Sequence, residues 1–411
     1  MRPDFHIIIV GGGMVGACAA ALAAANPRLA NLRIAVLEAN PPAQPQGEAD
    51  LRVSAVSRAS QRILAAVGAW PLIPAQSLSP YDEMIVWDAA SRPRGAGAIS
   101  FSASATSEPN LGHIVENRLL QWALYECPAF RRVTLLRAEL AGMTLERDRA
   151  VVSLGDDRTL SATLVIGSDG AASLSRKLAG IETAGWDYDQ RALVTHVRTE
   201  HSHARTAWQR FLADGPIAFL PLADGRSSIV WTTRPAHAEH LASCPPEEAA
   251  QEIERAIDGA LGKVEIAARR LHFPLRLAHA RQYCKERFAL VGDAAHAIHP
   301  LAGQGVNLGF LDCAALIEVL AQELANGADP GALAELRVLR RYERWRKSEN
   351  MIALGLVDGL NRLFSTSDAT LGSIRRAGLG AVDASALAKR FFMGRAMGTS
   401  GELPAVARVT P

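Results

Sequence analysis

The N-terminal part of the chain alternates short apolar runs with glycine-rich turns and a stretch of small residues. Residues 6–10 form a largely β-branched run, 17–25 are mostly alanine, and 33–37 form a second apolar run. Uninterrupted apolar runs of this length are typical of parallel strands buried on both faces. The pattern predicts strand, turn, close-packed helix and strand, which together make a βαβ unit.

Two later stretches repeat the order of strand, turn and helix. Residues 164–170 read as a strand that ends in a turn with an aspartate, and residues 171–176 continue into a helix. Residues 288–293 show the same pattern, and a helix is predicted from about 307 to 326.

The middle and the end of the chain have a different pattern. Short strand-like runs separated by Asp-Gly turns predict an inserted, mainly antiparallel sheet between 186 and 276, with a helix at 247–261. After Gly327 the chain is helical. The expected division is a nucleotide-binding domain in segments 1–80, 111–185 and 277–330, a substrate domain in segments 81–110 and 186–276, and a helical region at 331–411.

The composition narrows the class of protein. An apolar fraction of 49% and a charged fraction of 21% fit a globular protein, and a net charge of +2 without a basic stripe excludes a nucleic-acid partner. Five scattered cysteines without C-x-x-C predict neither disulfides nor a metal site. The apolar run at 7–25 is broken by glycines and lacks a basic flank, so we interpret it as strand, loop and helix and expect a cytoplasmic protein.

The turn after the first strand has the spacing of a dinucleotide-binding loop. Gly11, Gly13 and Gly16 satisfy G-x-G-x-x-G, and Glu38 ends the second strand. The first glycine allows the tight turn, the second lets a pyrophosphate approach, and the third lets the helix contact the strand. Glu38 can accept from ribose hydroxyls and disfavours a 2′-phosphate, so FAD or NAD is expected. The alternative is a tight turn without a ligand.

A second glycine-rich loop, at 300–305, leads into the helix predicted from 307. A helix N-terminus offers unpaired backbone N–H groups and the positive end of the helix dipole. This arrangement suits an electron-rich group such as a flavin ring, and the alternative is an ordinary strand-turn-helix corner. No second G-x-G-x-x-G follows a strand, so a nicotinamide cofactor would have no Rossmann domain of its own.

Three further features have a structural and a functional explanation. Arg52 and Arg118 are either solvated or contact a cofactor. Phe219, Pro221 and Trp231 belong to the core of the predicted sheet or line an apolar substrate pocket. The arginine-rich tail is either a solvated cap or a surface for assembly and for peripheral membrane contact.

The motifs together resemble those of the FAD-dependent aromatic hydroxylases of the p-hydroxybenzoate hydroxylase type. The shared elements are Gly11-x-Gly13-x-x-Gly16, Gly167-Ser168-Asp169-Gly170 and Gly292-Asp293, in that order. The resemblance implies an α/β fold: a Rossmann-like FAD-binding domain, an inserted mainly antiparallel β-sheet substrate domain and a helical C-terminal region.

A narrower resemblance covers nearly the whole chain. Segments 51–55, 112–117 and 292–309 look like the UbiH/UbiF/VisC family of ubiquinone biosynthesis, and most like its VisC-type branch of 2-polyprenylphenol hydroxylases. One departure is Ala172, where the family usually carries Asn, which affects the expected docking of a pyridine nucleotide.

The motifs and the resemblance together predict the residues of the site. Gly11, Gly13, Gly16 and Glu38 would hold the ADP half of FAD, and Asp293 its ribityl chain. His299 and Pro300 are the candidates for catalysis, with His299 handling the phenol proton. The predicted cofactor-binding set is Gly11, Gly13, Met14, Val15, Gly16, Glu38, Arg52, Arg118, Asp169, Gly170, Gly292, Asp293, Pro300, Ala302, Gly303, Gln304, Gly305, Val306 and Asn307.

The resemblance also implies a reaction. NADH or NADPH would reduce FAD, O₂ would give a flavin C4a-hydroperoxide, and a polyprenylated phenol would take up its distal oxygen. The implied partners are other ubiquinone-biosynthesis proteins or a second copy of the chain, bound through the C-terminal region. The alternatives are hydroxylation of another aromatic compound and a flavin-binding assembly subunit.

Overall fold

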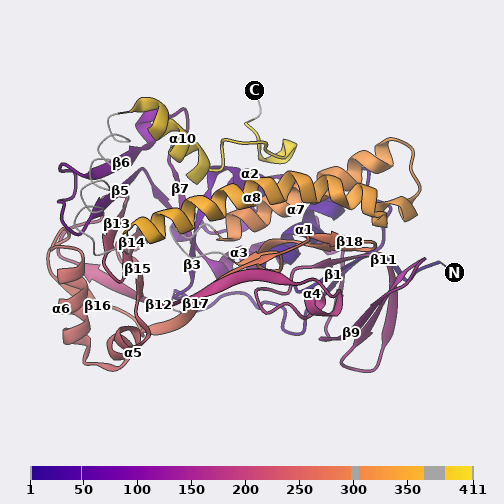
Figure 1. Cartoon of the computed structure of the whole chain (residues 1–411), viewed down its shortest axis with the longest axis horizontal. Helices are drawn as coiled ribbons and strands as arrows, with labels where there is room; N and C mark the ends of the chain where they lie inside the picture. The colour runs from indigo at the N-terminus through magenta and orange to yellow at the C-terminus, as the bar shows by residue number, and fades with distance from the viewer. Residues whose placement is uncertain (1, 48, 298–304, 365–384, 410–411) are drawn as a thin grey trace.

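A mainly parallel sheet forms one half of the molecule (Figure 1). The computed structural model describes residues 2–47, 49–297, 305–364 and 385–409. The strands of this sheet are β1 (Phe5–Val10), β2 (Ile34–Leu37), β8 (Thr134–Leu136), β9 (Leu140–Leu145), β10 (Ala150–Leu154), β11 (Thr159–Gly167), β18 (Cys284–Lys285) and β19 (Phe288–Leu290). Their order is β18-β19-β11-β1-β2-β8, with β10 and β9 paired beside β11. The fully buried β1 pairs in parallel with β2 and β11, as the apolar run predicts.

Helices pack around this sheet. They are α1 (Met14–Ala25), α2 (Arg58–Ala66), α3 (Asn117–Glu126), α4 (Leu174–Leu178), α7 (Gly305–Ala325) and α8 (Leu336–Phe364). A further helix, α10 (Ala386–Ala396), lies at the other half of the molecule, where Met393 and Met397 pack with Ala103 and Leu111. The alanine-rich α1 is buried along almost its whole length and packs against α3 and α7, because small side chains allow the helix axes to approach closely. In the helical tail, α8 is one continuous helix that runs along α7 (Figure 1). No described helix is long and apolar enough to span a membrane.

A second, mainly antiparallel sheet forms the other half of the molecule (Figure 1). Its strands are β5 (Glu83–Asp88), β6 (Ala98–Ser102), β12 (Thr183–Thr199), β13 (Thr206–Leu212), β14 (Gly215–Pro221), β15 (Ser227–Thr233), β16 (Val264–Ile266), β17 (Leu271–Ala280) and β20 (His296–Ala297). The order is β20-β17-β12-β15-β14-β13-β5-β6, with β16 beside β12. Only the β13–β5 pair is parallel among the described strands of this sheet. The long β12–β17 ribbon links the two halves (Figure 1).

The second sheet extends beyond the segments expected for it. β12 begins at Thr183 and β17 ends at Ala280, and the two-residue strand β20 pairs with β17 at the edge of the sheet. The segment expected to belong to the nucleotide-binding domain therefore also contributes an edge strand to the substrate sheet. A small third sheet, made of β3 (Val53–Ser57), β4 (Ser79–Tyr81) and β7 (Gly112–Glu116), has β7 as its central strand.

The two faces of the second sheet have different partners. Ile217 and Phe219 on β14 belong to a core shared with α5 (Pro235–Ser243) and α6 (Pro246–Ala256). Leu220 instead packs with residues of β3 and β7, because successive side chains on a strand point to opposite faces. The prediction that Phe219 and Trp231 line a substrate pocket is wrong, since both lie in the core under α5 and α6.

The same alternation of side chains also speaks against the prediction that Pro221 lines a substrate pocket. It lies two residues after Phe219 on β14 and therefore on the same face of the sheet, away from the third sheet. The sequence could not distinguish the two faces, because every residue of β14 is buried and no polar alternation marks one side.

A buried ionic network ties α7 and α8 to the edge of the second sheet. The Asp312 carboxylate accepts from His296 Nε2 at 2.5 Å and from Arg346 Nε at 2.9 Å, and all three side chains are buried. Asn350 Nδ2 donates to Asp312 Oδ1 at 3.0 Å, and the backbone N–H of Gly292 donates to Oδ2 at 3.2 Å. Although burial alone would raise the pKa of Asp312, the adjacent His296 and Arg346 lower it to about 2. The carboxylate is therefore ionised at neutral pH.

Replacing Arg346 with Met should destabilise the protein strongly. The substitution removes the guanidinium and leaves the buried Asp312 charge short of a partner, which costs about 3–5 kcal/mol of unfolding free energy. Urea denaturation followed by circular dichroism measures this loss. The matched control is Arg337→Met in the same helix, because Arg337 is 61% exposed and its ion pairs with Glu323 and Glu335 are worth less than about 1 kcal/mol. Equal effects of the two substitutions would contradict the importance of the buried network.

Stability should fall between pH 6.5 and pH 4. Burial, with a smaller effect of His296, lowers the pKa of His279 from 6.5 to about 4. The unfolded chain therefore binds more protons in this window, and each such histidine lowers the unfolding free energy by up to about 1.4 kcal/mol per pH unit as the pH falls. His279→Gln should make the measured slope shallower, whereas His201→Gln, at an exposed position, should leave it unchanged. An unchanged slope in His279→Gln would contradict this assignment.

Candidate cofactor-binding site

The surroundings of the three glycines after β1 differ. A side chain at Gly11 or Gly16 would collide with the backbone, whereas Gly13 faces open space. Gly11 has φ +92°, and a Cβ there would lie 2.8 Å from the Asp169 Cα. A Cβ on Gly16 would lie 1.9 Å from the Gly11 carbonyl oxygen, whereas a Cβ on Gly13 would meet nothing within 4 Å. The middle glycine therefore faces the space in which a pyrophosphate could approach the backbone.

The N-terminus of α1 has the chemistry of an anion site. Gly13 is its N-cap, and neither a side-chain cap nor an acidic residue occupies its first turn. The first N–H groups of a helix have no partner inside the helix, and they point along the positive end of its dipole. A phosphate group at this place would complete the hydrogen bonding of these donors.

The ribose-binding candidate Glu38 is held in place by the glycine turn. Its Oε2 accepts from the Gly12 N–H at 2.8 Å and its Oε1 from the Asn40 N–H at 2.9 Å. The Gly12 carbonyl in turn accepts from Gln121 Nε2 at 3.0 Å and from the Tyr125 hydroxyl at 2.9 Å. The two α3 residues were not predicted. Their spacing of four, which places both on one face of the helix, was the available signal.

The glycine loop after β1 and the segment that contains Gly292 and Gly309 contact each other at Val15. A Cβ on Gly292 (φ +60°) would lie 2.9 Å from Val15 Cγ1, and one on Gly309 would lie 2.6 Å from Val15 Cγ2. Cys313 Sγ also donates to the Val15 carbonyl at 3.2 Å. Segments nearly three hundred residues apart in the chain therefore form one wall.

Asp293 is available to a ligand at this wall. Its side chain is exposed and forms no hydrogen bond with the described residues. The surrounding protein nevertheless raises the pKa of this carboxyl by desolvation. A free carboxyl group next to the α1 N-terminus matches the predicted role of accepting from the hydroxyls of a ribityl chain.

Asp169 shapes a loop, and its carboxylate accepts three hydrogen bonds from the start of α4. Oδ1 accepts from the Ser173 and Ser175 hydroxyls, each at 2.6 Å, and Oδ2 accepts from the Ser175 N–H at 2.8 Å. These hydrogen bonds position the carboxylate, and the contact of Asp169 with a cofactor stays a prediction. The buried Arg176 then donates to the Ala294 carbonyl at 2.7 Å and so joins this loop to the turn that carries Asp293.

The side chain of Asn307 likewise joins two elements of the fold. Its Oδ1 accepts from the Ser57 N–H at 2.9 Å and its Nδ2 donates to the Ala55 carbonyl at 2.8 Å, inside a buried contact between α7 and β3. Its side chain is thus engaged within the protein, and the contact of Asn307 with a cofactor stays a prediction. Gly305 and Val306 begin α7, while Gly170 follows Asp169 in the left-handed region with φ +78°. The predicted residues His299, Pro300, Ala302, Gly303 and Gln304 lie outside the described residues.

The two predicted arginines lie near the start of α3. Arg118 Nε donates to Glu116 Oε2 at 2.8 Å, and the same oxygen accepts from the Asp50 N–H. The exposed Arg52 lies with its guanidinium carbon 5.8 Å from the centre of the Phe273 ring on β17. The structure thus brings both residues to the junction between the third sheet and the β12–β17 ribbon.

A small apolar cavity of about 20 Å³ lies between the second and the third sheet. Tyr81, Met84, Ile114 and Leu220 are among its walls, and Gln209 adds an amide group. The side chains of Tyr81 and Gln209 form no hydrogen bond with other described residues. Burial raises the pKa of Tyr81 to about 12, so its hydroxyl stays protonated.

The cavity adjoins the cofactor site. Ala55, which lines it, accepts a hydrogen bond from Asn307 in the first turn of α7. At about 20 Å³ the cavity has room for about one water molecule, so its walls would have to move apart to admit an aromatic ring.

FAD fits the residues that are present. The open Gly13, the uncapped α1 N-terminus and the free Asp293 would bind its pyrophosphate and ribityl chain, and Glu38 stands at the end of β2 for the ribose. When bound, FAD supplies electron transfer from a reduced nicotinamide and activation of O₂.

Comparison with known proteins agrees with this site. The family model described as "FAD binding domain" matches residues 4–347. The chain is 38% identical to ubiquinone hydroxylase UbiL of Rhodospirillum rubrum over 396 residues, which cover 96% of this chain and 89% of that protein. It is 37% identical to 3-demethoxyubiquinol 3-hydroxylase of Escherichia coli over 397 residues, which cover 96% and 98%.

Solved structures share the fold. The p-nitrophenol 4-monooxygenase PnpA of Pseudomonas putida superposes with a TM-score of 0.74 at 17% identity and covers 98% of this chain and 100% of that one. CabE, an aromatic hydroxylase from angucycline biosynthesis, has a TM-score of 0.70 at 23% identity, with coverage of 96% and 76%.

The fold and the site thus define an FAD-dependent aromatic hydroxylase, as the sequence predicts. Within that class, the chain belongs to the FAD-binding-domain family that contains the ubiquinone-biosynthesis hydroxylases.

Gly16→Ala should abolish FAD binding and also destabilise the protein, because its Cβ would collide with the Gly11 backbone. Gly13→Ala should fold with an unchanged melting temperature in the apoprotein, because its Cβ meets no protein atom, yet it should bind FAD at least about tenfold more weakly. Flavin fluorescence titration and thermal melting separate the two effects. Undiminished FAD affinity in Gly13→Ala would show that the pyrophosphate does not approach this turn.

Proposed function

We propose that the protein hydroxylates the aromatic ring of a polyprenylated phenol in ubiquinone biosynthesis. In the overall reaction the phenol, O₂, NADH or NADPH and one proton give the hydroxylated ring, oxidised nicotinamide and water. The observation that carries the proposal is the dinucleotide cradle, with the open Gly13 and the uncapped α1 N-terminus, in a chain with relatives named for ubiquinone hydroxylation.

We propose that the ring enters between the second and the third sheet by widening this small cavity, and that Gln209 and Tyr81 then orient it through its hydroxyl group. They are the polar groups among otherwise apolar walls formed by residues such as Met84, Ile114 and Leu220. Apolar walls favour the aromatic ring and exclude the water that would divert the oxidant. Holding the ring at fixed distance from the flavin is the part of the catalysis that this chain supplies itself.

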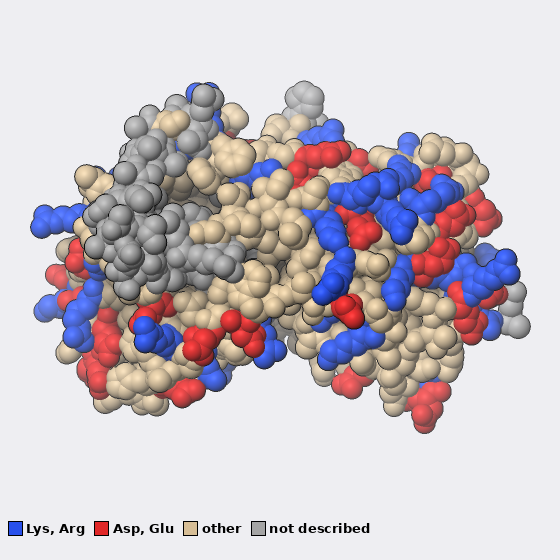
Figure 2. All heavy atoms as spheres, in the orientation of Figure 1, with Lys and Arg blue, Asp and Glu red and all other residues tan. Residues whose placement is uncertain are grey.

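The prenyl tail would leave the cavity toward the C-terminal helices. Met351 and Ile352 on α8 are 51% and 44% exposed, and Phe391 on α10 is 47% exposed. Apolar side chains exposed on neighbouring elements support a contact with the membrane surface, from which a lipid-like substrate is taken up. On the face shown in Figure 2, positive and negative side chains are interspersed, so such a contact would depend more on apolar than on charged groups.

The test is oxidation of NADH and of NADPH by the FAD-loaded protein with and without short-chain 2-prenylphenols. Oxidation stimulated by the phenol, together with a product that has gained one oxygen atom, is the expected result. Product NMR then assigns the ring carbon. Stimulation by non-prenylated aromatics alone would favour the hydroxylase of another compound, and flavin binding without any product would favour an assembly subunit.

A variant in the cavity locates the substrate. Gln209→Met keeps the size of the side chain and removes its hydrogen bonding, so KM for the phenol should rise about tenfold. The control is Phe219→Leu on the opposite face of the sheet, which should change KM little. If Gln209→Met leaves KM unchanged, the ring is not oriented by this amide.

A further inference from the structure

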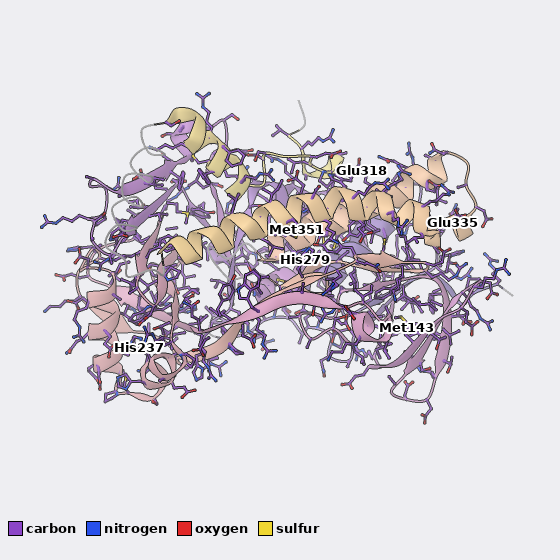
Figure 3. All side chains as sticks on the ribbon, in the orientation of Figure 1. Met143, His237, His279, Glu318, Glu335 and Met351 are labelled. Carbon is purple, nitrogen blue, oxygen red and sulfur yellow. The ribbon has the colours of Figure 1, made fainter. Side chains whose placement is uncertain are left out.

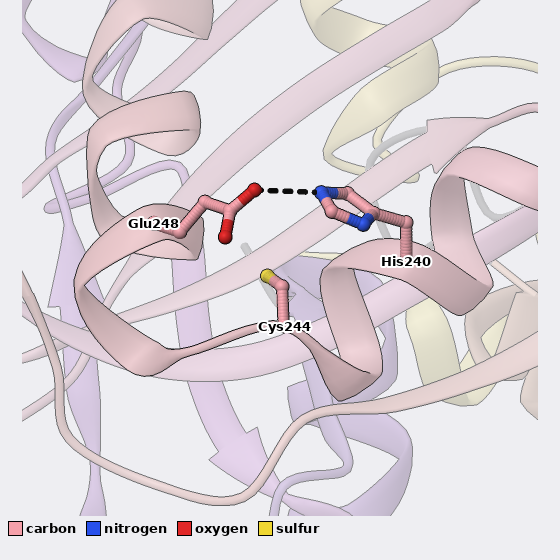
Figure 4. Close-up of side chains that lie close together, drawn as sticks. All are labelled: His240, Cys244 and Glu248. Carbon is pink, nitrogen blue, oxygen red and sulfur yellow. Dashed lines mark ion pairs between the residues drawn. The ribbon is translucent and has the colours of Figure 1, made fainter.

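A second group of reactive side chains lies on the far side of the substrate sheet. His240, Cys244 and Glu248 each offer one ligand atom, and these atoms lie within 4.8 Å of one another (Figure 4). The group belongs to α5 and α6, which pack on the face of the sheet opposite to the cavity. Figure 3 shows His237 of α5 at the end of the molecule remote from Met143 in the FAD-binding sheet.

The spacing of the cluster follows from the two helices. His240 and Cys244 are four residues apart, at the last turn and C-cap of α5, and Glu248 and Glu252 are four residues apart in the first half of α6. Residues four apart share one face of a helix. Because Pro245 reverses the chain between the helices, the two pairs face each other.

The contacts show a converging arrangement. His240 Nε2 lies 3.1 Å from Glu248 Oε1 and 3.5 Å from Glu252 Oε1. Figure 4 shows the sulfur of Cys244 directed into the space between His240 and Glu248. The thiol makes two long contacts, at 3.8 Å to the Leu241 carbonyl and at 3.5 Å to Arg270 Nη1.

The carboxylate of Glu252 is oriented by groups behind it. His237 Nε2 lies 2.8 Å from Glu252 Oε2, and His237 Nδ1 lies 2.8 Å from the Thr233 hydroxyl. If the hydroxyl donates to Nδ1, the neutral imidazole donates from Nε2 to the carboxylate. Carboxylates that bind metals are held in this way by a partner outside the coordination sphere.

The charges of the cluster call for a cation. With the thiol ionised, Cys244, Glu248 and Glu252 carry three negative charges, and the guanidinium of Arg270, whose Nη1 lies 3.5 Å from Cys244 Sγ, supplies one positive charge. The remaining two negative charges match a divalent ion.

We propose that this cluster is a zinc site that joins α5 to α6. Its ligands are His240 Nε2, Cys244 Sγ and a Glu248 oxygen, with Glu252 in the fourth position. Nitrogen, sulfur and carboxylate ligands in fourfold coordination are the set that Zn²⁺ prefers, whereas Mg²⁺ and Ca²⁺ take oxygen ligands. Binding releases the Cys244 proton, so affinity increases with pH. The regular four-residue spacing differs from the C-x-x-C pattern, which explains why the sequence alone did not predict a metal site.

The test uses the FAD-loaded protein, stripped with a chelator and then titrated with Zn²⁺ against a chromophoric indicator, with metal content measured by mass spectrometry. We expect one zinc ion per chain, a higher melting temperature, and tighter binding at pH 8 than at pH 6. His240→Gln and Glu248→Gln should weaken binding more than tenfold, and His237→Gln, which removes the group orienting Glu252, about tenfold. His240 and Glu248 lie at the surface, so these variants should fold.

The control is His201→Gln, which removes an exposed histidine outside the cluster and should leave zinc binding unchanged. Zinc affinity equal in the His240, Glu248 and His201 variants would overturn the proposal, as would the absence of any stabilisation by zinc. In those cases the cluster is an ion pair between two helix ends only. Because the site is remote from the cavity, removal of zinc should leave the turnover number for NADH oxidation unchanged.

Discussion

The buried carboxylate of Asp312 is the constraint on which the architecture around the cofactor site depends. A charge taken out of water is tolerated only if it is paired and hydrogen-bonded. Asp312 obtains its partners from β20, from the turn at Gly292 and from α8. These elements belong to different parts of the chain, so the fold can satisfy this one group only when the helical tail is docked. The tail is therefore structurally necessary for the motif that carries Asp293.

Close packing of backbones is the second constraint. Val15 lies against both Gly292 and Gly309, and Gly11 lies against Ser168 and Asp169. A side chain at any of these glycines would separate walls that must meet for the cradle to exist. The glycines of the three motifs thus form a single contact surface, although they are spread over almost three hundred residues. This explains why motifs that are common individually become informative when they occur together in order.

The sequence predicted those features that depend on local pattern. The βαβ unit, the antiparallel insert and the helical tail follow from runs of apolar residues and from glycine and aspartate in turns, and the structure confirms the fold class. The inward face of β14 could not be predicted, because Ile217 to Leu220 are all buried and only the tertiary arrangement decides what each residue meets. Arg346 was hidden for a similar reason: the arginine-rich stretch suggests a solvated surface, yet this one guanidinium is buried against Asp312.

The roles of polar residues were also harder to predict than their positions. Asp169 and Asn307 both lie at the site, but their side chains form hydrogen bonds within the protein. The side chain of Asp293 forms no hydrogen bond with the described residues. The sequence shows which polar residues lie at the edge of a sheet. It does not show which of their oxygen atoms accept hydrogen bonds from other parts of the folded chain.

The division of labour between the two sheets explains how one fold serves different aromatic substrates. The dinucleotide cradle is made of backbone atoms and glycines, so it tolerates little change. The cavity is made of side chains on the inner face of the inserted sheet, and each can change without disturbing the ladder of hydrogen bonds that holds the strand. Chains only 17–23% identical to this one keep the fold, and their names refer to different aromatic substrates. In such a fold, the side chains that line the substrate pocket determine which substrate is bound. Under the proposed function, the choice of substrate would rest with the side chains around Tyr81 and Gln209, on the face of the sheet opposite to α5 and α6.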